Sequence, residues 1–149
     1  QNKIIVKEYN KILIKNKKEE KKDYIIEFND KVIIDNLTIE KVDSEIQDGN
    51  EVCRINTNNI KLPLYIRNRK DGDFIILKGN KRKKIKEIFI EKKIPISVRN
   101  NYPLLVDSNN NIIWIPNLKK SKFCIKKDQN YDIIVRCKWK RGTLWIKKK

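Results

Sequence analysis

The apolar residues of this chain fall into short runs, rich in Ile, Val and aromatic side chains, that clusters of Asn, Asp and Lys interrupt. This pattern is typical of short β-strands joined by turns. No apolar run approaches the roughly 20 residues that a membrane-spanning helix needs. With 149 residues, of which 39% are hydrophobic, the chain has the length and apolar content of about one domain. We therefore expect a soluble, mainly β (α+β) fold.

The strand candidates share β-branched or aromatic side chains and flanking turn residues. They are residues 4–7, 12–15, 24–28, 31–34, 37–42, 52–56, 62–67, 74–77, 104–107, 112–115, 122–126, 132–138 and 143–147. Asn29-Asp30 has the composition of a hairpin loop, and so has the Asn-rich segment 108–111. Pro63 has no N–H for a strand ladder, so it should lie at a sheet edge or at a strand start.

One amphipathic helix is expected between about residues 81 and 93. Ile85, Ile88 and Phe89 follow one another at i, i+3 and i+4, the spacing that places side chains on one face of a helix. A proline ends this helix, and residues 97–101 are expected to form a second, shorter helical turn.

The composition excludes several kinds of catalytic site. Histidine is absent, which excludes a Ser-His-Asp triad and a His-based metal site. The four glycines form neither of the glycine-rich loops that cradle phosphates in nucleotide-binding enzymes. Cys53, Cys124 and Cys137 are odd in number and widely spaced. We interpret them as reduced thiols of a cytoplasmic protein, packed in its core.

Asp71 and Asp73 are two neighbouring carboxylates that could form an acid/base or metal pair. A turn at Gly72, with Arg67 and Arg69 as partners of the carboxylates, is the favoured interpretation.

The net charge of +17 is distributed unevenly. Residues 1–60 carry −1, residues 61–100 carry +9 and residues 101–149 carry +9. A field of this kind attracts a polyanion and releases the counterions condensed on it. We expect nucleic acid to be that polyanion and rank a membrane surface second, because no basic amphipathic helix is visible.

The segment 78–86 has six positive charges in nine residues and no negative charge. Cations at a helix start are unfavourable because of the helix dipole, so we expect a phosphate to lie there. A solvated lysine loop with no binding role is the alternative. The candidate RNA-contacting residues are Arg67, Arg69, Lys78, Lys81, Arg82, Lys83, Lys84, Lys86 and Arg99.

The three tryptophans differ in their surroundings. Trp114 lies in an apolar strand and is expected in the core. Trp139 and Trp145 lie among lysines and arginines, where packing in the core and stacking on RNA bases are both open.

Several ordered motifs resemble the C-terminal domain of tRNA(Ile)-lysidine synthetases. Residues 67–73 resemble its R-x-R-x-x-G-D motif, and residues 83–89 its K-K-L-K-x-x-F helix. Residues 94–105 and 113–117 resemble its I-P-x-x-x-R-x-x-x-P-L-L and I-x-W-V-P-G segments. The chain departs from the pattern at Asp71, where the family often has proline, and at its last motif position, which is Asn instead of Gly.

The resemblance implies a layered, β-sandwich-like fold shared with part of the phenylalanyl-tRNA synthetase β subunit. It implies residues 59–149 as the family domain and residues 1–58 as a strand-rich leading segment packed with it. The family's enzymes convert the wobble cytidine of a minor isoleucine tRNA to lysidine with ATP and lysine.

The ATP-binding loop of that family is not present in this sequence, so we expect the chain to be a fragment of a longer ligase. It would be non-catalytic, dock the acceptor-stem side of the tRNA and bind no cofactor itself. ATP and Mg²⁺ would bind a separate catalytic domain. The alternative is a basic interaction module for an acidic protein or another RNA.

Overall fold

The computed structural model describes residues 22–140. Its strands are β1 (Ile25–Phe28), β2 (Lys31–Ile34), β3 (Leu37–Val42), β4 (Val52–Ile55), β5 (Leu64–Arg67), β6 (Phe74–Ile76), β7 (Arg82–Lys84), β8 (Leu104–Val106), β9 (Ile112–Ile115), β10 (Lys119–Lys120) and β11 (Ile133–Trp139). Its helices are α1 (Ile85–Glu91) and α2 (Ile96–Arg99), with 3-10 turns at Thr57–Asn59 and Lys78–Asn80.

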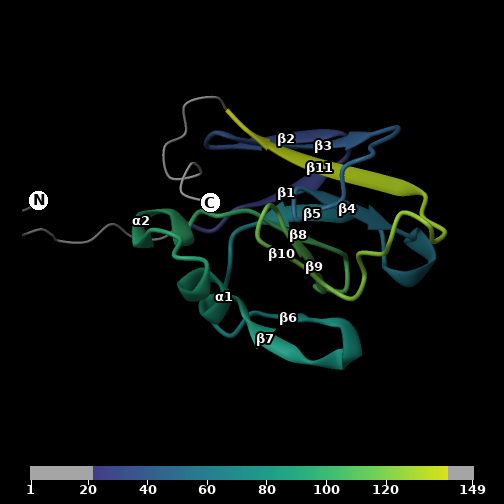
Figure 1. Ribbon diagram of the computed structural model, residues 1–149. Coiled ribbons are helices and arrows are strands. Elements are labelled where there is room, and N and C mark those ends of the chain that lie inside the picture. The colour runs from purple at the N-terminus through teal and green to yellow at the C-terminus, as the bar shows by residue number, and fades with distance from the viewer. Residues whose placement is uncertain (1–21, 141–149) are drawn as a thin grey trace, which may run out of the picture.

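The described strands form two large antiparallel sheets and one hairpin. The five-stranded sheet has the order β1-β5-β8-β9-β10, and the four-stranded sheet has the order β2-β3-β11-β4. The four-stranded sheet covers one side of the five-stranded sheet, whereas the β6–β7 hairpin and α1 lie on the other side (Figure 1). The predicted mainly β, layered and sandwich-like architecture is confirmed.

The core contains buried side chains from both large sheets and from α1. Leu37 and Ile39 come from the four-stranded sheet, Ile66 from the five-stranded sheet, and Ile85 and Phe89 from α1. Burying each such side chain contributes on the order of 1.5–3 kcal/mol. The helix is thus held in place by the apolar face that its sequence pattern predicts.

Three strand predictions, 31–34, 37–42 and 112–115, have the correct bounds, but the hairpin expected at Asn29-Asp30 is wrong. β2 and β3 match the predicted strands 31–34 and 37–42. β1 pairs with β5, whereas β2 pairs with β3 across a turn in which Asp35 has a φ of 54°. The turn at Asn29-Asp30 therefore carries the chain from one sheet to the other.

The helix begins later than its sequence pattern predicts. Lys81 follows a turn in which Gly79 and Asn80 have positive φ, and residues 82–84 then pair with β6. The helix proper covers Ile85–Glu91. The expected cluster of lysines in a first helical turn is therefore not formed, because Lys83 and Lys84 belong to β7, whereas Lys86 lies in the helix.

The predicted hairpin across residues 108–111 is confirmed, since β8 pairs with β9. Trp114 is buried in β9 as expected, and its indole N–H donates to the carbonyl oxygen of Asn50 at 3.0 Å. Trp139 is half-buried, and its ring centroid lies 6.3 Å from that of Tyr102. This contact favours the packing alternative for Trp139. Pro63 precedes β5, which agrees with the predicted strand start.

Residues 122–126 do not form the expected strand. They make a single bridge, between Cys124 and Ile55 of β4. The chain then turns, because the backbone N–H of Lys126 donates to the side chain of Gln129 at 2.8 Å. A short strand, β10, lies just before this segment and pairs with β9.

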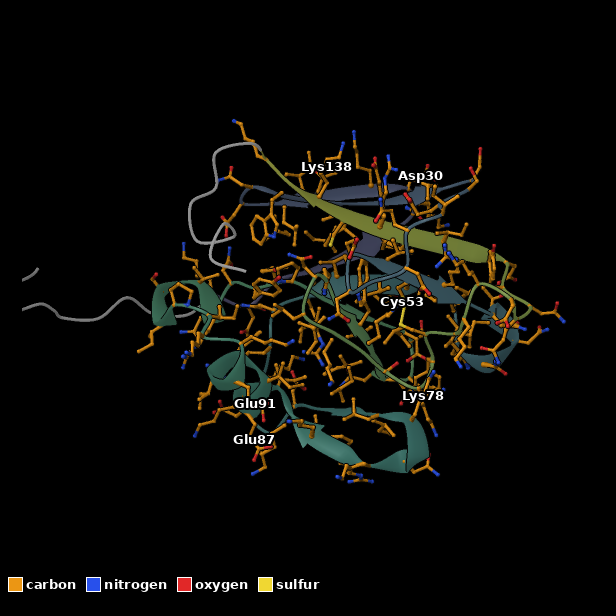
Figure 2. All side chains as sticks on the ribbon, in the orientation of Figure 1. Asp30, Cys53, Lys78, Glu87, Glu91 and Lys138 are labelled. Carbon is orange, nitrogen blue, oxygen red and sulfur yellow. A yellow bond between two sulfur atoms is a disulfide. The ribbon has the colours of Figure 1, made fainter. Side chains whose placement is uncertain are left out.

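The prediction that all three cysteines are reduced thiols is wrong. Cys53 and Cys124 form a disulfide, with Cα atoms 5.5 Å apart (Figure 2 labels Cys53). The two residues are 71 positions apart in sequence, so spacing alone does not indicate the pairing. Cys137 is buried in β11, as expected of a core residue, and lies outside the disulfide.

Some predicted features lie outside the described residues. These are the strands 4–7, 12–15 and 143–147, and Trp145. Within residues 22–140, neither α-helix has the length or the apolar character required to traverse a lipid bilayer.

Candidate nucleic-acid interface

The β6–β7 hairpin displays the basic segment 78–86 that stands out in the sequence. Phe74 lies opposite Lys84 and Ile76 opposite Arg82. Neighbouring residues of a strand point to opposite sides, so Arg82 and Lys84 share one side of β7, and Lys83 faces the other. Arg82 and Lys84 are exposed, and Lys83 is half-buried.

Exposed Arg82 contacts an aromatic ring on the neighbouring strand. Its guanidinium carbon lies 4.5 Å from the ring centroid of Phe74, a distance typical of a cation–π contact. This contact holds the guanidinium beside the hairpin. An arginine held in this way presents its N–H groups at the surface.

Lys83 extends from the hairpin toward the end of α1. Its Nζ lies 2.6 Å from a carboxylate oxygen of Glu91. The hydrogen bond from Lys83 is the main reason why the pKa of Glu91 lies below its ordinary value. The positive charges of Lys119 and Lys92 lower this pKa further. These effects indicate that lysines from β7, β10 and the end of α1 gather around one carboxylate.

A cavity of about 360 Å³ opens between the turn of the hairpin, the end of α1 and β10. We call it the lysine cleft, because its lining contains Lys78, Lys92, Lys119, Lys120 and Lys126. Asp48 is the carboxylate in this lining, and its oxygen lies 3.6 Å from Nζ of Lys120. The cationic side chains of the lining therefore outnumber its carboxylates. Such a cleft concentrates a positive field on one side of the molecule.

Sequence reasoning found one of these five lysines, Lys78. The other four follow the basic segment 78–86 in the sequence, at positions 92, 119, 120 and 126. β10 reaches the cleft because Lys119 pairs with Ile115 at the edge of the five-stranded sheet. The adjacent pair Lys119-Lys120 is the sequence signal that could have pointed to this strand.

Arg67 is not at the surface, which corrects its assignment as an RNA contact. Its side chain is 1% exposed. Two of its nitrogens donate to the carboxylate of Asp73 at 2.8 and 3.1 Å, and two donate to Oδ1 of Asn110 at 3.2 and 3.1 Å. The favoured interpretation of Asp73, a turn carboxylate paired with Arg67, is confirmed. A sequence of basic residues does not indicate which of them is buried.

Arg69 and Arg99 lie near α2, away from the lysine cleft. Arg69 donates to Oδ1 of Asn100 at 3.2 Å, and its guanidinium carbon lies 5.7 Å from the ring centroid of Phe89. Arg99 donates to the carbonyl oxygen of Ile94 at 2.8 Å. Figure 1 shows α2 at the end of the molecule far from the tip of the β6–β7 hairpin.

The structure thus divides the predicted contacts into three groups. Lys78, Lys81, Arg82, Lys83, Lys84 and Lys86 are on the hairpin, its turn and the start of α1. Arg69 and Arg99 form a second group near α2, and Arg67 is buried.

The opposite side of the molecule has mixed charge. Figure 2 shows Lys138 and Asp30 on that side, and Lys78 beside the hairpin. Arg136 of β11 lies 3.1 Å from Glu40 and 3.0 Å from Glu45. Hydrogen bonds to these carboxylates raise the pKa of Arg136. Among residues 22–140, no group of three Cys, Asp or Glu side chains is placed to hold a metal ion.

The chain matches the model of a known domain family and a solved structure. The family, described as the TilS substrate C-terminal domain, matches residues 64–139. A crystal structure described as the TILS C-terminal domain superposes with a TM-score of 0.71 at 32% sequence identity. That superposition covers 79% of this chain and 98% of the solved one.

Curated relatives carry the name tRNA(Ile)-lysidine synthase. The protein of Bacillus licheniformis is 46% identical over 88 residues, which are 58% of this chain and 18% of that protein. The protein of Bacillus subtilis (strain 168) is 50% identical over 82 residues, 54% of this chain and 17% of that protein. The chain thus spans about a fifth of the length of these relatives. The family model covers about half of this chain and the solved domain is covered almost whole, so the chain belongs to the family of TilS substrate C-terminal domains.

Proposed function

We propose that this chain binds tRNA through the lysine cleft. The observation that supports the proposal is the convergence of five lysines on one cavity. They come from the hairpin turn, the end of α1, β10 and the segment after it. A single solvated lysine loop, the alternative interpretation, would not place lysines from four separate segments around one cavity.

Lysine is suited to contacts with a phosphate backbone. Its ammonium is a compact charge on a flexible stem, so it follows phosphates without demanding one geometry. Each phosphate that a lysine neutralises releases condensed counterions, which makes binding favourable and dependent on salt. Contacts of this kind fix the register and orientation of the RNA and carry no sequence information of their own.

The names of the relatives suggest the RNA and the context. We propose that the chain docks the acceptor-stem side of a minor isoleucine tRNA. A separate catalytic domain, which would bind ATP and Mg²⁺, would then convert the wobble cytidine to lysidine. In this arrangement the chain positions its substrate and performs no chemistry itself. The role also implies a cytoplasmic protein.

Filter binding at several salt concentrations tests the lysine cleft. We expect the logarithm of the affinity for an isoleucine tRNA to fall with the logarithm of salt with a slope of several units. The triple variant Lys92→Gln, Lys119→Gln, Lys126→Gln should reduce this slope by about one unit for each phosphate that a lysine no longer neutralises. At about 0.1 M salt its affinity should be lower by at least tenfold.

The matched control changes three lysines on the opposite sheet, Lys31→Gln, Lys41→Gln and Lys138→Gln. These residues are exposed in β2, β3 and β11. The control removes the same net charge, so a purely long-range effect would weaken binding equally in both variants. Equal losses, or binding that does not respond to salt, would contradict the proposal. A tRNA chimaera tests the docking side. It carries the acceptor stem of the isoleucine tRNA on the body of another tRNA, and it should bind as tightly as the complete isoleucine tRNA.

A further inference from the structure

A second cavity of about 360 Å³ lies between the β6–β7 hairpin and the loop that joins β8 to β9. Its lining includes Phe74, Arg82, Asn109, Asn110 and Phe123. The volume is within the range of pockets that hold small organic groups. Its composition differs from that of the lysine cleft, because aromatic rings and amides stand in its lining in place of the lysines.

The aromatic rings of this cavity have cations beside them. The ring of Phe74 is accessible, since the residue is 37% exposed. Arg82 lies over its ring, and Nζ of Lys122 lies 5.5 Å from the ring centroid of Phe123. Exposed rings interleaved with cations are the platforms on which proteins stack unpaired nucleic-acid bases.

The amide wall of the cavity is held rigidly. The carboxylate of Asp107 accepts hydrogen bonds from the backbone N–H groups of Asn109 and Asn111 at 3.0 and 2.9 Å. Buried Arg67 donates twice to Oδ1 of Asn110. A guanidinium can only donate, so it fixes Oδ1 toward Arg67 and directs the amino group of this amide away from it. The orientation of the Asn110 amide is therefore set before any ligand arrives.

Amides of this kind match the edges of bases. The amide of Asn109 offers a donor and an acceptor side by side, as a base edge does, and asparagine commonly pairs with adenine in this way. Asn110 offers its amino group as a donor, because its Oδ1 accepts from Arg67. Gly72 also belongs to the lining, and its φ of +86° is a conformation that L side chains rarely adopt.

The cavity adjoins the lysine cleft. The backbone N–H of Lys122 donates to Ile76 of β6 at 2.9 Å, and its side chain donates to Asn80 in the hairpin turn at 2.8 Å. Ser121, one residue earlier, lines the lysine cleft, and Phe123, one residue later, lines this cavity. An RNA backbone in the lysine cleft would thus run past the mouth of the second cavity.

We propose that this cavity takes up one unpaired base of the bound RNA, which stacks on Phe74 or Phe123 and hydrogen-bonds to Asn109 and Asn110. The inference rests on the proposed RNA-binding function and adds base recognition to it. Phosphate contacts cannot distinguish one RNA from another, whereas a cavity for a single base distinguishes RNAs that present an unpaired base at the right place.

RNA hairpins with one unpaired nucleotide test the proposal with the complete chain. The nucleotide is placed either as a 3′ overhang or as a bulge, and carries either 2-aminopurine or no base. We expect one of the two placements to bind about 5- to 100-fold more tightly with the base than without it. The fluorescence of 2-aminopurine should fall in that complex, because the base stacks on an aromatic ring.

Two variants locate the effect. Phe74→Leu keeps an apolar side chain but removes the ring, and Asn109→Ala removes an exposed amide. Each should reduce the preference for the base, and Asn109→Ala should leave affinity for the abasic hairpin within twofold. Ile33→Ala, a change to a 59% exposed side chain on β2, is the control and should leave the preference unchanged.

The outcomes separate the two proposals. Equal affinity for base-bearing and abasic hairpins in both placements would overturn the cavity proposal and leave RNA binding intact. Absence of binding to every hairpin and to tRNA would overturn both. Adenosine monophosphate that binds as tightly as the base-bearing hairpin would assign the cavity to free nucleotides, and thus contradict the proposal as well.

Discussion

Replacing Arg67 with methionine tests whether this side chain stabilises the fold, as its burial indicates, or contacts RNA. The guanidinium is 1% exposed and holds the carboxylate of Asp73, which is 11% exposed. Methionine fills much of the same space but leaves Asp73 without its charged partner. Removing one member of a buried ion pair costs about 3–5 kcal/mol. We expect about 3 kcal/mol here, because the backbone N–H of Lys70 still donates to Asp73 at 2.7 Å.

Urea unfolding followed by far-UV circular dichroism measures this loss. With a slope of about 1.5–2 kcal/mol per molar urea, the midpoint should fall by roughly 1.5–2 M. Lys70→Met, a change to an exposed neighbour, should shift the midpoint by less than about 0.3 M. The double variant Arg67→Met, Asp73→Asn should regain part of the loss, since it leaves no charge buried. A midpoint shift below about 0.5 M in Arg67→Met, or no recovery in the double variant, would refute this reasoning.

Two further predictions concern exposed carboxylates. Glu91→Gln removes a negative charge that is paired with Lys83 beside the lysine cleft, so tRNA affinity should rise about two- to fivefold in filter binding. Unchanged affinity would place Glu91 outside the contact surface. Hydrogen bonds from Thr57 lower the pKa of Asp132, so the stabilisation is present at neutral pH and is lost as pH falls through that lowered pKa. Thr57→Val removes the hydroxyl donor and should move the pKa of Asp132 back toward its ordinary value in an NMR titration. An unchanged pKa would exclude the Thr57 hydroxyl as the cause.

The local pattern predicts strands well where turn residues bound them on both sides. β2 and β3 are bounded in this way, by Asn29-Asp30 and by Asp35-Asn36, and their predicted ends are correct. The same pattern does not predict partners. β1 and β2 are adjacent in sequence but belong to different sheets, because β1 completes the five-stranded sheet beside β5.

The start of the helix shows a second limit. Residues 82–84 are cationic, and long charged side chains are acceptable in a helix and at an exposed strand. Residues 82–84 form a strand because they pair with β6. This pairing depends on a turn with positive φ at Gly79 and Asn80, and hydrophobic periodicity does not indicate such a turn.

The sequence predicts that the interface is rich in lysine and arginine, but it does not predict where on the fold these residues lie. The basic hairpin follows from the run of charges in residues 78–86, but Lys119 and Lys126 reach the lysine cleft only through the folded arrangement of β10 and the segment after it. Burial likewise removes Arg67 from a set of residues that sequence treats as equivalent. Charge is a property of a residue, whereas a binding surface is a property of the fold.

The position of β11 between β3 and β4 bears on how the chain is made. Both neighbours leave the ribosome well before β11 does, because β11 is the last of the described strands in sequence. At about 5–20 residues per second, the nascent polypeptide waits several seconds with the facing edges of β3 and β4 unpaired. This layer therefore closes only after β11 has been synthesised, and a transcript truncated before the codons of β11 would yield a product unable to close it.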